Sequence, residues 1–285
     1  MRATSRARVV TTGAEAVGDP PAKLVIDGLV LDYVNPETGA AHRAVEGLDL
    51  RVAPNEFLCV LGPSGCGKST LLAAVAGFIT PTQGSIVMDG TPVKGPGAER
   101  GVVFQEYALL PWMNVLDNAA LGLKLRGVAR DERYQIARRF LALTNLRDAE
   151  HKFPHELSGG MKQRVAVART LANAPEVMLM DEPFAAVDAQ TRMTLQEELA
   201  RIASHSRLTV VFITHSVEEA IFLGNRVAVM TRGPGRIRTI VDVPFDRDAR
   251  TWSRLGADAA FTGLRERLLD LVRTDAPSRE GLAIA

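Results

Sequence analysis

The chain has few of the features that mark secreted, membrane-spanning or nucleic-acid-binding proteins. Its two cysteines, Cys59 and Cys66, do not have the setting of a structural disulfide, which suits a reducing compartment. No apolar run approaches the about 20 residues that a membrane helix needs, and no apolar core follows the basic residues 1–8, so no secretory signal is expected. With a net charge of only +1, the chain lacks the field that attracts nucleic acid or acidic lipid.

One stretch has the pattern G-x-x-x-x-G-K-[ST] of a phosphate-binding loop. Its residues are Gly62, Pro63, Ser64, Gly65, Cys66, Gly67, Lys68, Ser69 and Thr70. An apolar run precedes the loop and a helical pattern, 69–79, follows it, so backbone N–H groups and a helix dipole can face the phosphates of a nucleoside triphosphate. We expect Lys68 to reach the β- and γ-phosphates and the Ser69 hydroxyl to ligate Mg²⁺.

The loop residues alone leave some questions open. Glycine-rich turns also occur for structural reasons, although the strand before and the helix after this one favour nucleotide binding. Kinases, GTPases, recombinases and transport ATPases all use such a loop, so it does not select a reaction. Cys66 lies beside Lys68 and a helix start, which can favour a thiolate, but a small residue at a variable position is the simpler interpretation.

Apolar periodicity along the rest of the chain predicts an α/β fold. Runs at 24–33, 44–52 and 85–89 indicate antiparallel strands, residues 111–157 have helical periodicity, and two helix–strand alternations follow. We therefore expect a P-loop NTPase core with a mostly parallel sheet, an antiparallel β subdomain and an inserted α-helical subdomain. The expected limits are a flexible tail at 1–22, a nucleotide-binding domain at 23–240 with its helical subdomain at about 111–160, and a C-terminal tail at 241–285 with a helix at 262–273.

Polar residues follow three of the apolar runs assigned to the parallel sheet. Asp181 and Glu182 end one run, His215 follows another, and Gln105 follows a third. Carboxyl ends of parallel strands meet at one edge of a sheet, so we expect these side chains around the triphosphate. Asp181 is placed to hold Mg²⁺, and Glu182 to orient or deprotonate an attacking water. A single His or Gln at a strand end is more often structural, and the convergence of several strand ends favours function.

A second glycine-rich helix start lies at residues 157–163. Ser158 and the amides after it form an anion site by the same physics as the phosphate loop. A single domain with one triphosphate has no evident need for two such cradles. A head-to-tail dimer does, because each chain could offer its Ser158 to the triphosphate that the other chain holds.

These motifs resemble those of the ATP-binding cassette (ABC) superfamily, in its importer branch, over roughly residues 24–240. Residues 62–69 are similar to its Walker A loop, 157–163 to its signature motif and 178–182 to its Walker B strand. The resemblance implies ATP and Mg²⁺ as cofactors. The implied catalytic residues are Glu182 as base, His215 as switch histidine and Gln105 of the Q-loop. The implied magnesium ligands are Ser69, Gln105 and Asp181.

The same resemblance assigns further ATP contacts. The signature residues expected to contact the ATP of a second chain are Ser158, Gly159, Gly160 and Gln163. Tyr33 lies where the family places an aromatic that stacks on adenine, although packing at a strand end is the alternative. Asp188 matches the D-loop aspartate. The D-loop here reads Ala-Ala-Val-Asp in place of the common Gly-Ala-Leu-Asp, and Ser216 replaces the acid that usually follows the switch histidine.

A finer resemblance points to the nitrate, sulfonate and taurine importers, through residues 106–118, 153–156 and 233–237. It implies the ATP-hydrolysing subunit of an importer for a small anion such as taurine, an aliphatic sulfonate or nitrate. The implied partners are a second copy of the chain, integral membrane permease subunits and, indirectly, a periplasmic substrate-binding protein. The implied location is peripheral, on the cytoplasmic face of the inner membrane.

Rival functions explain less of the sequence. A P-loop metabolite kinase accounts for residues 62–69 but not for the second cradle at Ser158. Soluble non-transport cassette proteins typically have two cassettes on one chain or a cassette split by a long coiled coil. This chain has one cassette and no heptad run. Another ABC importer or an exporter ATPase is the nearest alternative, although exporters often fuse membrane helices to the cassette. A nucleic-acid partner is not expected, because the arginines of residues 126–139 are interspersed with acids.

Overall fold

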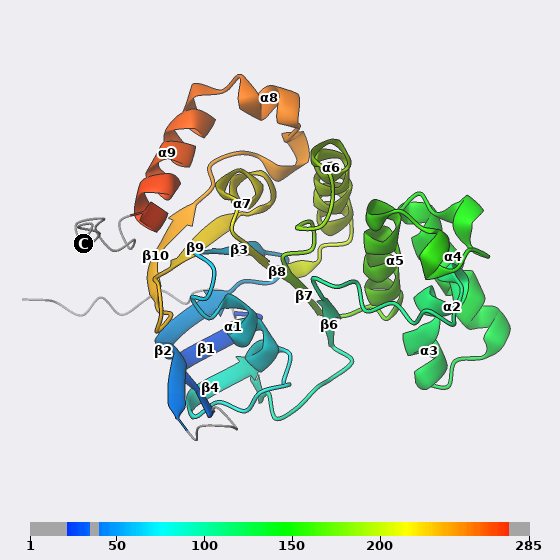
Figure 1. Cartoon of the computed structure of the whole chain (residues 1–285), viewed down its shortest axis with the longest axis horizontal. Helices are drawn as coiled ribbons and strands as arrows, with labels where there is room; N and C mark the ends of the chain where they lie inside the picture. The colour runs from blue at the N-terminus through cyan, green and yellow to red at the C-terminus, as the bar shows by residue number, and fades with distance from the viewer. Residues whose placement is uncertain (1–21, 35–39, 274–285) are drawn as a thin grey trace, which may run out of the picture.

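The framework of the protein is a six-stranded sheet with the strand order β10-β9-β3-β8-β7-β6 (Figure 1). The computed structural model describes residues 22–34 and 40–273. The strands are β3 (Phe57–Leu61), β6 (Arg100–Val103), β7 (Val177–Asp181), β8 (Thr209–Thr214), β9 (Arg226–Met230) and β10 (Ile237–Asp242). All neighbours pair in parallel except β10, which pairs with β9 antiparallel at the edge. The phosphate loop and the predicted strand-end residues therefore follow strands that point the same way.

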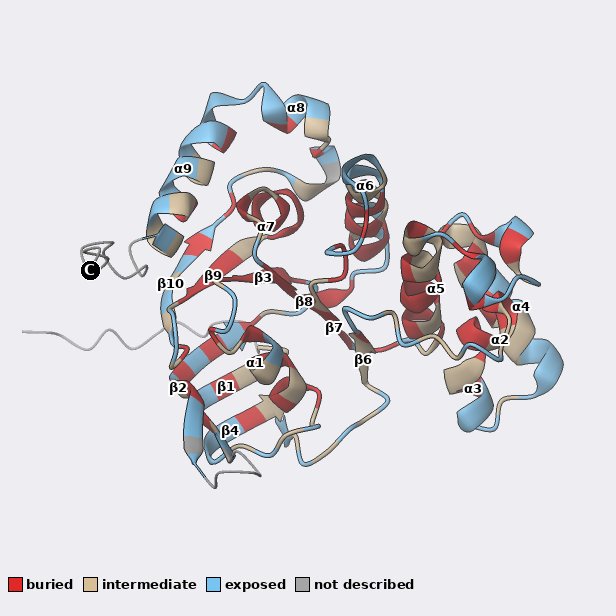
Figure 2. Cartoon of the chain, viewed as in Figure 1, coloured by how far each residue is buried: buried red, intermediate tan, exposed pale blue. Residues whose placement is uncertain are grey.

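The parallel sheet is buried on both faces, as its near-continuous apolar runs require. Alternate residues of each strand enter different cores; in β3, Phe57 and Cys59 lie in one and Leu58 and Val60 in the other. Helices α6 (Ala189–His205), α7 (Val217–Leu223) and α9 (Ala259–Arg273) contribute to the first core. Figure 2 shows the central strands buried and the outer side of α9 exposed.

An antiparallel sheet of the order β2-β1-β4-β5 covers the second core together with helix α1. Its strands are β1 (Leu24–Val34), β2 (Ala41–Val52), β4 (Gln83–Met88) and β5 (Thr91–Pro92), and α1 spans Lys68–Val75. The predicted helix ran to residue 79, but α1 ends earlier because Gly77 has a φ of +83° and lies against Gly95. A Cβ on Gly77 would stand 2.2 Å from the Gly95 oxygen, so this turn requires glycine.

Four helices form a separate group beside the β6 edge of the sheet (Figure 1). They are α2 (Val115–Ala119), α3 (Leu121–Leu125), α4 (Arg130–Leu143) and α5 (Gly159–Ala172). Their own core joins residues of α2 and α4 to Val165 and Ala168 of α5. Helix α5 thus carries this helical group past residue 160, and Arg169 from α5 donates to the carbonyls of Tyr107 and Ala108 at 2.9 and 2.6 Å.

The residues after 240 pack on the core. Trp252 of α8 (Trp252–Gly256) stacks on Phe222 of α7, with ring centroids 4.3 Å apart. The buried Arg250 guanidinium donates to the carbonyls of Ile221, Phe222 and Gly224 at the end of α7, and burial lowers its pKa to about 10. The predicted N-terminal tail lies outside the described residues, apart from Ala22. Within the described ranges, no helix has the length and apolarity needed to cross a bilayer.

Candidate functional site

The phosphate loop turns sharply between β3 and α1, and its glycines make the turn possible. Gly65 and Gly67 have φ values of +78° and +94°, and a Cβ on Gly67 would stand 2.6 Å from the Ala44 oxygen. Lys68 is only 5% exposed, and its ammonium donates to the carbonyls of Gly62 and Pro63 at 2.9 Å each. The loop therefore surrounds a cation that can meet the phosphates of a nucleotide.

Two oxygen ligands for a hard cation meet at the end of the loop. The Ser69 hydroxyl donates to Asp181 Oδ1 at 3.1 Å, which joins α1 to the last residue of β7. Burial raises the pKa of the Asp181 carboxyl, and the bond from Ser69 opposes that rise. A hydroxyl and a carboxylate in contact fit Mg²⁺, which prefers oxygen. Gln105 is exposed two residues beyond β6 at the same edge of the sheet, and within the described residues no hydrogen bond joins it to Ser69 or Asp181.

Glu182 joins the phosphate loop to the end of β8. Its Oε2 lies 2.8 Å from Nδ1 of His215, whose ring N–H donates to the carboxylate, and its Oε1 lies 3.9 Å from the Lys68 ammonium. The Glu182 backbone has a φ of +41°, an uncommon conformation for a side chain of this size. That turn aims the carboxylate across the ends of the strands. The structure thus brings together five predicted residues: Lys68, Ser69, Asp181, Glu182 and His215.

Asp181→Asn is expected to stabilise the fold and abolish turnover. A carboxyl whose folded pKa is raised contributes its full stability below the unfolded pKa and loses it as pH rises through the folded pKa. At neutral pH the partly buried charge is a cost that asparagine removes, while the amide oxygen can still accept from Ser69. We expect a higher Tm than wild type at pH 7.5, no difference near pH 3, and ATPase activity reduced by at least about 10²-fold.

Thermal unfolding at both pH values and a phosphate-release assay with Mg²⁺ check this prediction. An Asp270→Asn variant on α9 is the control, because that residue lies far along the chain from the strand ends. A lower Tm for Asp181→Asn at pH 7.5 would contradict the stated cost of the buried charge.

The predicted signature residues divide into an exposed and a buried set. Ser158 is exposed and caps α5 by accepting from the Met161 N–H at 3.3 Å. Gly159 lies near the Ala186 carbonyl, and a Cβ on Gly160 would stand 2.6 Å from Thr191 Cγ2. These contacts bring the start of α5 against the turn that leads into α6.

Asp188 lies in that turn and caps α6. Its carboxylate accepts from the Thr191 N–H at 3.0 Å, and this backbone hydrogen bond lowers its pKa. The exposed Asp188 and Ser158 thus sit at the starts of two adjacent helices.

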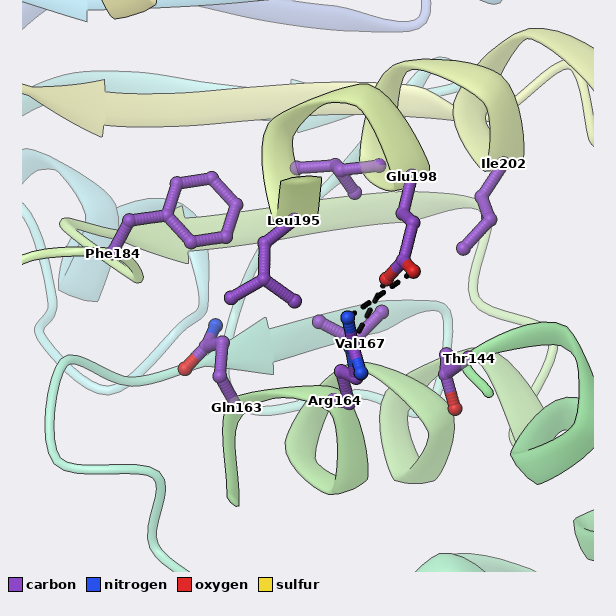
Figure 3. Close-up of a pocket in the computed structure, with 9 residues that line it drawn as sticks. Thr144, Gln163, Arg164, Val167, Phe184, Leu195, Glu198 and Ile202 are labelled. Carbon is purple, nitrogen blue, oxygen red and sulfur yellow. Dashed lines mark hydrogen bonds and ion pairs between the residues drawn. The ribbon is translucent and has the colours of Figure 1, made fainter. Parts of the chain in front are cut away.

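Gln163 does not share this surface. Its side chain is fully buried and points toward Phe184 and Leu195, between α5 and α6 (Figure 3). The structure does not support the expected contact of Gln163 with a second chain's ATP, because five residues after Ser158 the helix has turned this side chain toward its own core.

Two other predicted residues, Tyr33 and Cys66, make fewer contacts that indicate a role. Tyr33, near the end of β1, is 43% exposed, so its ring is available for stacking. Cys66 is buried, and burial raises the pKa of its thiol, although the nearby Lys68 charge acts in the opposite direction. This environment favours the simple interpretation of Cys66 as a small packed residue.

Sequence reasoning missed a buried polar network behind His215. Glu219 accepts from the Thr214 hydroxyl and from Gln196 Nε2, the latter at 2.7 Å, and Thr214 in turn accepts from the Ser216 N–H. Burial raises the pKa of Glu219. Ser216 and Glu219 have the sequence of a capping box. Ser216 does accept from the Glu219 N–H, but the Glu219 carboxylate turns inward instead of returning to Ser216.

The fold and the site together define a P-loop nucleoside triphosphatase. The family model described as ABC transporter matches residues 45–185. The chain is 50% identical over 234 residues to a taurine import ATP-binding protein of Chromobacterium violaceum, which covers 81% of this chain and 90% of that protein. It is 46% identical over 240 residues to a nitrate import ATP-binding protein of Synechococcus elongatus, covering 83% of this chain and 87% of that one. The protein belongs to the ABC transporter family, as an ATP-binding cassette.

Solved structures agree with this assignment. A dimeric bacterial ABC transporter cassette matches with a TM-score of 0.69 and 28% identity, covering 78% of this chain and all of that chain. A dimeric post-hydrolysis state of an ATP-binding cassette bound to ADP and Pi matches with a TM-score of 0.67 and 28% identity, with the same coverage. The predicted fold class is confirmed. The chain is an ATPase of the ABC type, with ATP and Mg²⁺ as its nucleotide and ion.

Proposed function

We propose that this chain is the ATP-hydrolysing subunit of an importer for a small anion such as taurine, an aliphatic sulfonate or nitrate. The supporting observation is the identity of 46–50% to import ATP-binding proteins named for taurine and nitrate. Another relative at 50% identity, from Methanocaldococcus jannaschii, is an uncharacterized ABC transporter ATP-binding protein. The relatives therefore support a class of small anions and do not select one of them.

The dimer is proposed from the separation of two phosphate-competent surfaces on one chain. Lys68 and its partners lie at the carboxyl edge of the sheet, whereas Ser158 starts α5 in the helical group, on the far side of β6 from α1 (Figure 1). Ser158 and Asp188 are exposed, although they make no described contact with the Lys68 site of their own chain. Two chains placed head to tail would bring the Ser158 surface of each onto the phosphate loop of the other.

The residues at the strand ends suit hydrolysis within such a dimer. Lys68 would neutralise charge on the β- and γ-phosphates, and Ser69 and Asp181 would hold Mg²⁺ with Gln105. Mg²⁺, when bound, supplies charge neutralisation at the phosphate oxygens. Glu182 would take the proton of the attacking water, and His215 would orient that carboxylate and stabilise the transferred phosphoryl group. Dimer closure on ATP would drive the permease toward its outward-facing state, and opening would follow phosphate release.

The permease is proposed to dock beside the segment after Gln105. Phe78 and Phe104 stack with their ring centroids 6.1 Å apart, and Phe78, Phe104 and Trp112 are 53%, 40% and 70% exposed. Exposed aromatic side chains of this size are typical of a surface that a partner covers. Arg169 ties the segment to α5, so a force on the segment would reach Ser158. A peripheral position at the cytoplasmic face of the inner membrane follows from this docking.

Mixing two inactive variants tests the shared site. In a head-to-tail dimer, Ser158→Arg blocks the partner's site and Lys68→Met disables its own, so each variant alone should be inactive. A mixed dimer retains one intact site, formed by Lys68 of one chain and Ser158 of the other. Random pairing makes half of the dimers mixed, so we expect the mixture to regain about a quarter of wild-type ATPase activity if sites act independently. A mixture that stays inactive, while both variants remain folded and pair, would contradict the head-to-tail arrangement.

The imported anion is tested by growth. A strain lacking this gene should fail on taurine or an alkanesulfonate as sole sulfur source, or on nitrate as sole nitrogen source, and the wild-type gene should restore growth. The Glu182→Gln gene should not restore it. Normal growth of the deletion strain on all these sources would overturn the assignment of the cargo class and leave the ATPase activity unaffected.

A further inference from the structure

Helices α5 and α6 carry the two surfaces proposed to face a second chain, and they meet through the first core and a small polar cluster. Gly160 lies directly against Thr191 near their starts. About one turn further along α5 and two turns further along α6, Arg164 reaches Glu198 (Figure 3). The relative position of Ser158 and Asp188 therefore depends on this close approach, on one ion pair and on the core that Val167 of α5 shares with residues of α6.

Two residues of the helical group donate hydrogen bonds to Glu198. Arg164 donates through Nε at 3.1 Å and through Nη2 at 3.2 Å, one bond to each carboxylate oxygen. Asn145, in a left-handed turn just after α4, donates to Glu198 Oε1 at 2.7 Å. The side chains of Arg164 and Glu198 are 21% and 13% exposed, so solvent screens this pair only partly. Glu198 thus connects α6 to α5 and to the residues that follow α4.

Packing around this cluster is incomplete. A cavity of about 20 Å³ lies between the two helices, bounded by Gln163, Leu195 and Glu198 among others. The buried Gln163 amide points into this region, and neither its oxygen nor its nitrogen has a hydrogen-bond partner among the described residues (Figure 3). A space of this size holds one water. Because the apolar packing leaves this gap beside Gln163, the Glu198 bonds add to the contacts that set the geometry between α5 and α6.

We propose that Glu198 is a positioning residue for ATP hydrolysis, which holds the start of α5 in register with the start of α6. It acts through Arg164, six residues along α5 from Ser158, or about 9 Å. Asp188 begins the helix that carries Glu198 itself. A rigid helix transmits a rotation at Arg164 to Ser158, so loss of the pair would misplace Ser158 against the second chain while leaving the Lys68 site intact. This inference rests on the proposed dimer.

The test is a charge-swap series in the full-length chain. The variants are Glu198→Gln, Glu198→Arg, Arg164→Glu and the double variant Arg164→Glu/Glu198→Arg. Glu197→Arg is the matched control, because its carboxylate lies on the same helix but accepts from the Trp252 N–H. The readouts are the ATP affinity of the monomer, kcat, and ATP-dependent dimerisation measured in a Glu182→Gln background.

Glu198→Arg and Arg164→Glu should lower kcat and ATP-dependent dimerisation by about tenfold or more, with the Kd for ATP within about twofold of wild type. Glu198→Gln, which folds with the least disturbance, should lose a smaller share in the same two readouts. The double variant should recover at least half of the loss, and Glu197→Arg should match wild type.

Two results would overturn the proposal. One is wild-type kcat and dimerisation in Glu198→Arg and Glu198→Gln. The other is an equal loss of ATP affinity and kcat that the double variant does not rescue, which would mean a general folding role. A wild-type chain that hydrolyses ATP without dimerising would instead refute the proposed dimer, and this inference with it.

Discussion

Glu182→Gln should bind ATP as wild type does and turn it over about 10²–10⁴-fold more slowly, the range that a positioned general base contributes. Glutamine has nearly the same shape as glutamate and can still accept from His215, which lies 2.8 Å away. It cannot take a proton from water. Closed, ATP-bound dimers should therefore accumulate, because the step that opens them is blocked.

Fluorescent-nucleotide titration, phosphate release and analytical ultracentrifugation with ATP measure these three effects. Glu266→Gln is the control, since it makes the same change on an exposed residue of α9, outside the site. Turnover at the wild-type rate would assign the base to another group. A loss of ATP binding in Glu182→Gln would mean that the 3.9 Å contact between Glu182 and Lys68 organises the phosphate loop itself.

The sequence predicts which residues lie at the carboxyl edge of the sheet, because apolar runs separated by helical segments are enough to predict parallel strands. Near-continuous apolar runs could only be strands buried on both faces, and the helices between them required parallel pairing. Once β3, β7 and β8 are parallel neighbours, Gly62, Asp181 and His215 must emerge at one edge. The pairs Leu61 with Thr214 and Asp181 with Ile213 place those ends at nearly the same level.

Residues whose role depends on the direction in which a helix presents them were harder to predict from the sequence. Gln163 belongs to a glycine-rich motif by sequence, but its direction depends on where α6 packs, and α6 lies more than twenty residues away along the chain. Glu219 offers the local alternative of a capping box, and the buried Gln196 and Thr214 provide stronger partners than Ser216. A signal did exist for Glu219, since an acid at the third position of a buried helix start must find a donor.

Lys68→Met should abolish ATP binding and, with it, turnover. Contacts from an ammonium to phosphate oxygens each contribute about 1.5–3 kcal/mol, and we expect Lys68 to make two of them, so ATP affinity should fall by about 10²–10⁴-fold. Methionine keeps the length of the buried stem but cannot donate to Gly62 and Pro63. The folded state should survive, because the loop conformation depends on Gly65 and Gly67, whose φ values are positive.

The measurements are nucleotide titration, phosphate release and thermal unfolding, with Lys94→Met as an exposed control. The comparison with Glu182→Gln separates binding from chemistry: Lys68→Met should lose both, whereas Glu182→Gln should lose only the second. ATP affinity within about threefold of wild type in a folded Lys68→Met chain would mean that backbone N–H groups and the helix dipole bind the phosphates without the ammonium. The buried lysine would then be a structural brace of the loop, and the charge at the γ-phosphate would have to come from another residue.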